Sequence, residues 1–183
     1  MIVYLDTGIM LDYLSQRSHG GALLRTANRR GRTPNQLCDD ATTCFDQLRQ
    51  HHETHTSSLT LFEAEKTLFD AMSSQLAAVP DRFRYIVTSA RAISVQVLTA
   101  VRFNRIIVDN LDVATFEHVV GDLELQQRGI RVGDSLHMVS AIRCNAELLI
   151  SGDAGVIGLD GVFRNNAGQV IRCLDTDTAM TVL

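Results

Sequence analysis

Four acidic residues stand where a folded chain could use their carboxylates for chemistry: Asp6, Glu63, Asp134 and Asp153. Asp6 directly follows a short apolar run near the start of the chain, and Asp153 follows a similar run near its end. If both runs are strands of an open parallel sheet, these two carboxylates lie beyond the carboxyl ends of the strands, where such sheets bind ligands. Carboxylate oxygens in such a place suit hard divalent cations. Taken singly, each of the four also has a structural explanation as a helix-cap, first-turn or strand-end residue.

The pattern of apolar residues predicts an α/β fold. Short runs rich in aliphatic or β-branched residues indicate strands at residues 2–5, 53–57, 105–108, 148–150 and 170–174. Helical spacing between these runs indicates helices at about residues 9–14, 60–72, 80–103, 112–127 and 132–142. Because strands alternate with helices, the central twisted sheet should be mostly parallel and flanked by helices on both faces, in three layers.

Local signals place the expected helix starts. Asp39 or Asp40 is suited to cap a helix before the second strand. Thr60 and Glu63 have the spacing of a capping box at the start of the next helix. Pro80 opens a further helix, and we expect these last two helices to pair as a hairpin.

A basic segment interrupts this pattern at about residues 15–38. It contains no acidic residue but five arginines, Arg17, Arg25, Arg29, Arg30 and Arg32. Two adjacent glycines and Pro34 oppose a long helix there, so we expect an insertion or a mobile segment within a single domain, residues 1–183. Such a segment could grip phosphates, bind an acidic partner or remain a solvated loop.

Composition excludes several classes of protein. With 183 residues and 45% hydrophobic side chains, the chain is able to build a core, which argues against disorder. No apolar run approaches the ~20 residues of a membrane-spanning helix and no signal peptide is evident, so we expect a cytoplasmic protein with no membrane partner. A net charge of −4 argues against coating nucleic acid by bulk electrostatics. The four cysteines form no CxxC pair, which indicates reduced, buried thiols.

The four acidic residues lie in four short segments, residues 2–7, 57–63, 133–141 and 148–153. The sequence and order of these segments resemble the PIN-domain nucleases, particularly the VapC-type toxins of toxin–antitoxin pairs. The resemblance spans nearly the whole chain. It implies a PIN-like three-layer fold in which the four acidic residues converge in one catalytic pocket.

A pocket of that kind needs a compensating charge, because four neighbouring carboxylates cannot all remain ionised. An all-oxygen ligand set suits Mg²⁺ or Mn²⁺ rather than zinc, and we expect Asp6, Asp134 and Asp153 to be the metal ligands. The resemblance implies a metal-dependent endoribonuclease that hydrolyses RNA phosphodiester bonds. It further implies a cognate antitoxin protein as partner and a homodimer.

Some details of this pocket stay open in the sequence. Thr7 and Ser151 are expected to hydrogen-bond a ligand carboxylate or the phosphate, with ordinary turn hydroxyls as the alternative. The resemblance selects Glu63 as the catalytic glutamate, whereas a helical wheel places Glu65 closer to the apolar side. The family usually has Asn or Ser two residues after the first Asp, where this chain has Gly8, so one polar contact near the metal is missing.

The histidines are not expected to bind metal. We attribute His51, His52 and His55 to a solvated helix end, although the neighbouring threonines favour a strand. His137 follows Asp134 by three residues on the same helix side, so it could touch substrate. A hydrogen-bonded packing histidine is the preferred interpretation.

Two other functions fit part of the sequence. A catalytically inert PIN-like scaffold that binds RNA or a protein partner is the main alternative, because Gly8 and the open choice of glutamate depart from the nuclease pattern. A phosphatase of the haloacid dehalogenase type is disfavoured, since it would need a second Asp at the position of Gly8. Its lysine should also follow a late strand, whereas Lys66, the only lysine here, falls on a helix.

Overall fold

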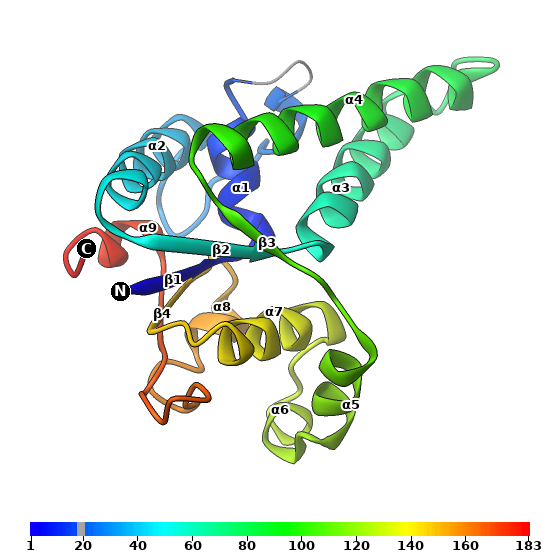
Figure 1. Ribbon diagram of the computed structural model, residues 1–183. Coiled ribbons are helices and arrows are strands. Elements are labelled where there is room, and N and C mark those ends of the chain that lie inside the picture. The colour runs from blue at the N-terminus through cyan, green and yellow to red at the C-terminus, as the bar shows by residue number, and fades with distance from the viewer. Residues whose placement is uncertain (18–20) are drawn as a thin grey trace.

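A computed structural model describes residues 1–17 and 21–183 and shows an α/β fold around one five-stranded sheet (Figure 1). Its strands are β1 (Ile2–Leu5), β2 (Glu53–Ser57), β3 (Ile107–Asp109), β4 (Leu148–Ile150) and β5 (Arg172–Leu174). Neighbouring strands pair in parallel, in the order β3-β2-β1-β4-β5. The expected parallel sheet is confirmed, and its carboxyl ends all meet at one edge.

Helices cover both faces of this sheet (Figure 1). The described helices are α1 (Thr7–Leu14), α2 (Pro34–His51), α3 (Leu59–Gln75), α4 (Arg82–Phe103), α5 (Val113–Gly121), α6 (Leu123–Gln127), α7 (Val132–Arg143), α8 (Ala154–Ile157) and α9 (Thr176–Ala179), with a 3-10 turn η1 (Gly21–Leu23). Val3, Leu5 and Ile150 point into a core shared with α1 to α4. Tyr4 and Leu149 point into a second core shared with α7 and α8. Successive strand residues alternate between the two cores, which gives the expected three layers.

α3 and α4 form the expected hairpin and extend beyond the sheet (Figure 1). Ile86, Ile93 and Val97 of α4 are fully buried, and the Ser94 hydroxyl donates to Glu65 at 3.1 Å. Among the described helices, α4 alone is long and apolar enough, by length and composition, to cross a membrane, although helices of soluble proteins meet the same criteria. The sequence expectation considered only uninterrupted apolar runs. Arginines interrupt α4, so that expectation did not single it out.

α2 begins earlier than predicted. Pro34 is its first residue, and Thr33 and Gln36 cap it through a reciprocal capping box. The predicted caps Asp39 and Asp40 lie inside the helix, so that prediction is wrong. The last residues of the Arg-rich segment, from Pro34 on, are therefore helical. Proline at the first position of a helix fits the backbone there and does not break the helix.

Other boundaries also moved. Ser58, not Thr60, precedes α3, and the predicted capping box is absent because the Thr60 hydroxyl is buried against Thr56. The helix predicted at 112–127 is divided into α5 and α6, because the Asp122 side chain accepts from the amide of Leu125 and starts a new helix. β3 and β5 each begin two residues later than predicted.

The histidine run divides between two elements. His51 ends α2, whereas His55 lies inside β2 and is only 7% exposed. Its ring nitrogens lie 3.0 Å from carboxylate oxygens of Asp109 and Glu53. The hydrogen bond with Asp109 outweighs burial and raises the pKa of His55. The interpretation as a solvated helix end is wrong for His55, because its β-branched neighbours draw it into the sheet.

Candidate carboxylate site

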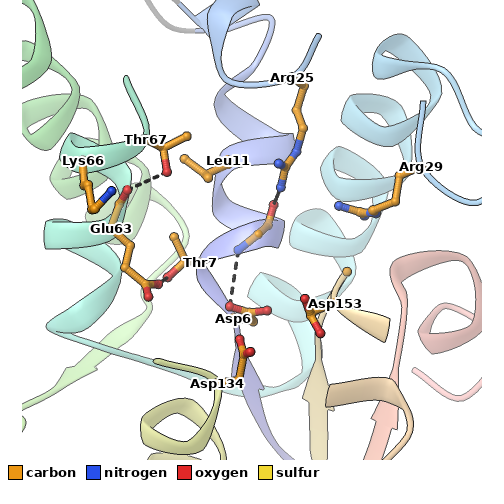
Figure 2. A pocket seen from close by; sticks show the side chains of 12 residues that line it. Asp6, Thr7, Leu11, Arg25, Arg29, Glu63, Lys66, Thr67, Asp134 and Asp153 are labelled. Atoms are coloured by element: carbon orange, nitrogen blue, oxygen red, sulfur yellow. Dashed lines mark hydrogen bonds between the residues drawn. The ribbon is translucent and has the colours of Figure 1, made fainter. Parts of the chain in front are cut away.

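A cavity of about 440 Å³ opens at the carboxyl edge of the sheet (Figure 2). The four acidic residues singled out in the sequence all line it: Asp6, Glu63, Asp134 and Asp153. Asp6 follows β1, Glu63 lies on α3, Asp134 on α7 and Asp153 follows β4. The fold therefore brings together residues that are far apart along the chain.

Asp6 occupies the centre of the site. It is 7% exposed and caps α1, where its Oδ1 accepts from the amide of Gly8 at 3.4 Å. Its Oδ2 accepts from the hydroxyl of Ser151, and that hydroxyl oxygen also accepts from the amide of Asp153 at 3.0 Å. Ser151 is fully buried, so it holds the ends of β1 and β4 in fixed register at the cavity.

Asp153 both caps a helix and lines the cavity. It caps α8, since its Oδ1 accepts from the amides of Gly155 at 2.6 Å and Val156 at 3.4 Å. Its carboxylate also faces Asp6 across the cavity (Figure 2). The sequence indicated only a strand-end turn residue here; the structure shows a helix cap, and this cap does not remove Asp153 from the site.

Asp134 lies in the first turn of α7 and is half-buried. Burial, followed by the charges of Asp153 and Asp6, raises its pKa to about 6. A carboxyl group is shifted in this direction when its surroundings hold more negative charge than the nearby side chains neutralise. The cavity is therefore electrostatically prepared for a cation.

The structure distinguishes the two candidate glutamates. Oε2 of Glu63 accepts from the Thr7 hydroxyl and lies 3.1 Å from Nε2 of His137. Glu65 instead accepts from Ser94 on α4 and points away from the cavity. Burial opposes ionisation of Glu63, but the hydrogen bond and charge of His137 outweigh it and lower the pKa of Glu63.

His137 lies beneath the carboxylates, with 1% of its surface exposed. Its Nδ1 is 2.9 Å from the Tyr4 hydroxyl, and its Nε2 is 3.1 Å from Thr7 and 3.5 Å from Asp6. Burial lowers the pKa of His137, but the charges of Asp6 and Glu63 outweigh burial and raise it. It is a hydrogen-bonded packing residue, as the sequence suggested, and it also contacts the site.

A substitution tests this packing role. We expect His137→Gln to lower the free energy of unfolding by about 2 kcal/mol, because Tyr4 and Glu63 lose buried hydrogen-bond partners. Urea unfolding curves measure the change, with His51→Gln at an exposed helix end as the matched control. Equal unfolding midpoints for the two variants would contradict this role.

Other side chains that line the cavity were not among the predicted site residues. Lys66 and Thr67 lie three and four residues after Glu63, a helical spacing that could have indicated them. Arg25 and Arg29 also line the cavity, and no local pattern places them there. Residues 18–20 of the Arg-rich segment lie outside the described part of the chain, so its mobility, like the single domain, stays a prediction.

The residues present fit a divalent cation. Ligand-type atoms of Asp6, Glu63 and His137 lie within 4.8 Å of one another, but Nε2 of His137 is engaged with Glu63 and would ligate only after losing that hydrogen bond. This group differs from the expected trio, because it includes a histidine nitrogen and Glu63 in place of Asp134 and Asp153. Those two carboxylates line the same cavity, so the site as a whole remains rich in oxygen donors.

Comparison with known proteins bears on the fold. No family model matches the chain, and no curated protein matches it in sequence. Among solved structures, it is similar to a chain in the crystal structure of VapBC2 from Rickettsia felis bound to a DNA fragment from its promoter. The TM-score is 0.51 at 15% sequence identity, over 94% of this chain and 98% of that chain. The likeness shows the fold. It is consistent with a PIN-like three-layer arrangement across nearly the full chain.

Proposed function

We propose that this protein is a metal-dependent endoribonuclease that hydrolyses RNA phosphodiester bonds and acts as the toxin of a toxin–antitoxin pair. The observation that carries the proposal is the group of four carboxylates around one cavity, in which the pKa of Asp134 is raised to about 6 by burial and by Asp153 and Asp6. The resemblance of the surrounding motifs supports the same activity. The structural likeness to VapBC2 also supports it, because the motifs resemble VapC-type toxins and VapBC2 is named for a VapC protein.

The side chains of the site have separable tasks in this proposal. Asp6, Asp134 and Asp153, with Glu63 beside them, would hold Mg²⁺ or Mn²⁺. When bound, the cation supplies charge neutralisation and Lewis-acid chemistry for phosphodiester hydrolysis. Ser151 fixes the orientation of Asp6 through its hydroxyl.

A second task belongs to the residues around Glu63. Thr7 donates to Glu63, and His137 keeps this glutamate ionised. Both contacts hold the carboxylate in one orientation, which is what an electrostatic site requires before substrate arrives. Thr7 and Ser151 each donate to a site carboxylate, and in this proposal they orient Glu63 and Asp6.

The partners follow from the same proposal. The protein is expected to act on RNA in the cytoplasm, to bind a cognate antitoxin protein that covers the acidic cavity, and to form a homodimer. The similar structure, VapBC2, is by its name a complex of a VapB with a VapC protein, which supports an antitoxin partner. The DNA in that structure is bound to that complex. No membrane partner is proposed.

Cleavage of a labelled pool of structured RNAs tests the proposal. Purified protein should cut the RNA with Mg²⁺ or Mn²⁺ and lose activity completely in EDTA, because the carboxylates alone repel the phosphate. Asp6→Asn should remove cleavage while retaining the fold, since the amide keeps the shape of the side chain and an acceptor for Ser151. Circular dichroism and gel filtration verify that the variant is folded.

The assay also separates the two leading functions. If folded wild-type protein cuts none of several RNA classes with either metal, the inert scaffold becomes the better description. If Asp6→Asn cuts at the normal rate, the catalytic centre lies elsewhere. Metal binding alone does not discriminate, because an inert pocket is also able to hold Mg²⁺.

A further inference from the structure

Two arginines of the Arg-rich segment reach the carboxylate cavity. Arg25 and Arg29 belong to the irregular chain between η1 and α2, and both line the cavity beside the acidic residues (Figure 2). Their side chains are 23% and 18% exposed, so they are largely sheltered but accessible from the cavity. The segment thus brings positive charge to the border of a negatively charged site.

The backbone at two glycines contacts these guanidinium groups, and one of the glycines, Gly152, makes room for its arginine. Nη2 of Arg25 donates to the carbonyl of Gly8 at 2.7 Å, and a Cβ atom at Gly8 would lie 3.4 Å from that nitrogen. A Cβ atom at Gly152 would overlap the guanidinium of Arg29, which lies directly against that backbone. Arg25 therefore occupies space next to Gly8, the position where the resembling family has Asn or Ser.

Two buried carboxylates hold the arginines in place. Asp12 on α1 has a fully buried side chain and pairs with both Arg25 and Arg29. Asp175 after β5, equally buried, accepts from Arg29 at 3.3 Å and also pairs with Arg32. Burying such ion pairs contributes little net stability, because desolvation offsets the attraction. What they achieve is the placement of two guanidinium groups at the cavity.

These anchors also keep the arginines off the candidate metal ligands. Within the described residues, no ion pair joins Arg25 or Arg29 to Asp6, Asp134 or Asp153. In the part of the chain that the structure describes, the hydrogen bonds of Arg25 run through Nε and Nη2 and those of Arg29 through Nη2, so Nη1 of each arginine donates to no protein acceptor. Guanidinium donors thus remain available beside the carboxylates, in a geometry suited to phosphate oxygens.

We infer that Arg25 and Arg29 bind backbone phosphates of the RNA that flank the bond at the carboxylate centre, and that a glycine at position 152 is required to admit Arg29. The inference rests on the proposed nuclease function and assigns its substrate grip. An arginine plug that blocks the cation site would instead pair directly with the site carboxylates.

RNA binding measured by fluorescence anisotropy tests this inference. The probe is a labelled 20-nucleotide single-stranded RNA, and the full chain carries Asp134→Asn so that the probe stays intact. Arg29→Gln and Gly152→Ala should each weaken binding by about tenfold. Each should also reduce the slope of log affinity against log salt by about 0.7, the value for one lost phosphate contact on a single strand.

The two variants complement each other. Arg29→Gln removes the charge but also leaves Asp12 and Asp175 short of a partner. Gly152→Ala keeps every charged group of the network, but its Cβ would overlap the Arg29 guanidinium and so displace it from the cavity. Arg172→Gln is the control, because Arg172 begins β5 at the opposite edge of the sheet and pairs with Asp160. It should change neither affinity nor salt slope.

The outcomes distinguish the inference from the proposed function. If the wild-type chain cuts RNA but the Arg29 and Gly152 variants bind with an unchanged salt slope, the phosphate grip is wrong and the nuclease stands. If the variants lose binding but no condition yields cleavage, the grip stands and the nuclease fails. If Arg29→Gln, in the chain that retains Asp134, binds Mn²⁺ more tightly but leaves RNA affinity and its salt slope unchanged, the arginine only opposes the cation and the inference is overturned.

Discussion

Replacing Asp134 with Asn is expected to reduce RNA cleavage by roughly a thousandfold, as happens when a group that stabilises transition-state charge is removed. The same substitution should raise the free energy of unfolding of the metal-free protein. Burial and the charges of Asp153 and Asp6 raise the pKa of Asp134 to about 6, so its ionised form is unfavourable in the folded state at neutral pH. The carboxylate cluster thus lowers the stability of the metal-free protein.

The size of the stability gain follows from that pKa. A fully sheltered carboxyl with this pKa would cost about 3 kcal/mol at neutral pH, and partial exposure to solvent reduces the expected gain to about 1 kcal/mol. When a carboxyl has a higher pKa in the folded state than in the unfolded state, the protein loses stability as the pH rises from the unfolded-state pKa towards 6. The gain from Asp134→Asn should therefore be present at pH 7.5 and absent at pH 4.

Thermal unfolding in EDTA and in Mg²⁺ measures both effects. Mg²⁺ should stabilise the wild-type chain, because a ligand that binds only the folded state shifts the equilibrium towards it. The Asp134→Asn chain should respond far less. A variant that is less stable than wild type in EDTA, or one that still cleaves at the wild-type rate, would contradict the electrostatic description of the site.

The second large effect is expected at Asp12. Asp12→Asn should lower the free energy of unfolding by about 3 kcal/mol, because Arg25 and Arg29 lose a fully buried partner. The chain between η1 and α2 should also become more accessible to trypsin, since these ion pairs fasten it to α1. Urea unfolding and timed proteolysis measure the two consequences.

The matched control for Asp12 is Asp177→Asn. Asp177 belongs to the same charge network, but its side chain is 52% exposed and lies 3.8 Å from Arg32. Exposed pairs of this kind contribute little, so the control should change stability by less than about 0.5 kcal/mol. If both variants unfold at the same urea concentration as wild type, the buried carboxylate does not anchor the segment.

Much of the fold was predictable because its signals are local. The strand at Ile2–Leu5 and the strand at Leu148–Ile150 are short apolar runs; Asp6 follows the first directly, and Asp153 comes three residues after the end of the second. A parallel sheet then places Asp6 and Asp153 at one edge, since parallel strands end on the same side. The motif resemblance added Asp134 and Glu63, which periodicity alone leaves as first-turn helix residues.

Tertiary packing decided what local patterns left open or gave wrongly. Glu63 rather than Glu65 faces the cavity because Ser94 on α4 engages Glu65, a contact between helices that a helical wheel of α3 does not contain. His55 lies in the sheet through its own strand, but the partner that satisfies its buried ring, Asp109, comes from β3. Such partners are distant in sequence, so their effect is invisible to periodicity.

The Arg-rich segment shows the same division most clearly. Its charge and its glycines were evident in the sequence, and they indicated an insertion that contacts substrate, a partner or solvent. Its attachment to Asp12 and Asp175, and the fit of Arg25 and Arg29 against Gly8 and Gly152, exist only in the folded chain. Sequence determined which chemical groups are available, because composition and local spacing do not depend on folding. Tertiary structure decided which groups meet, because burial and ion pairing join residues from separate elements.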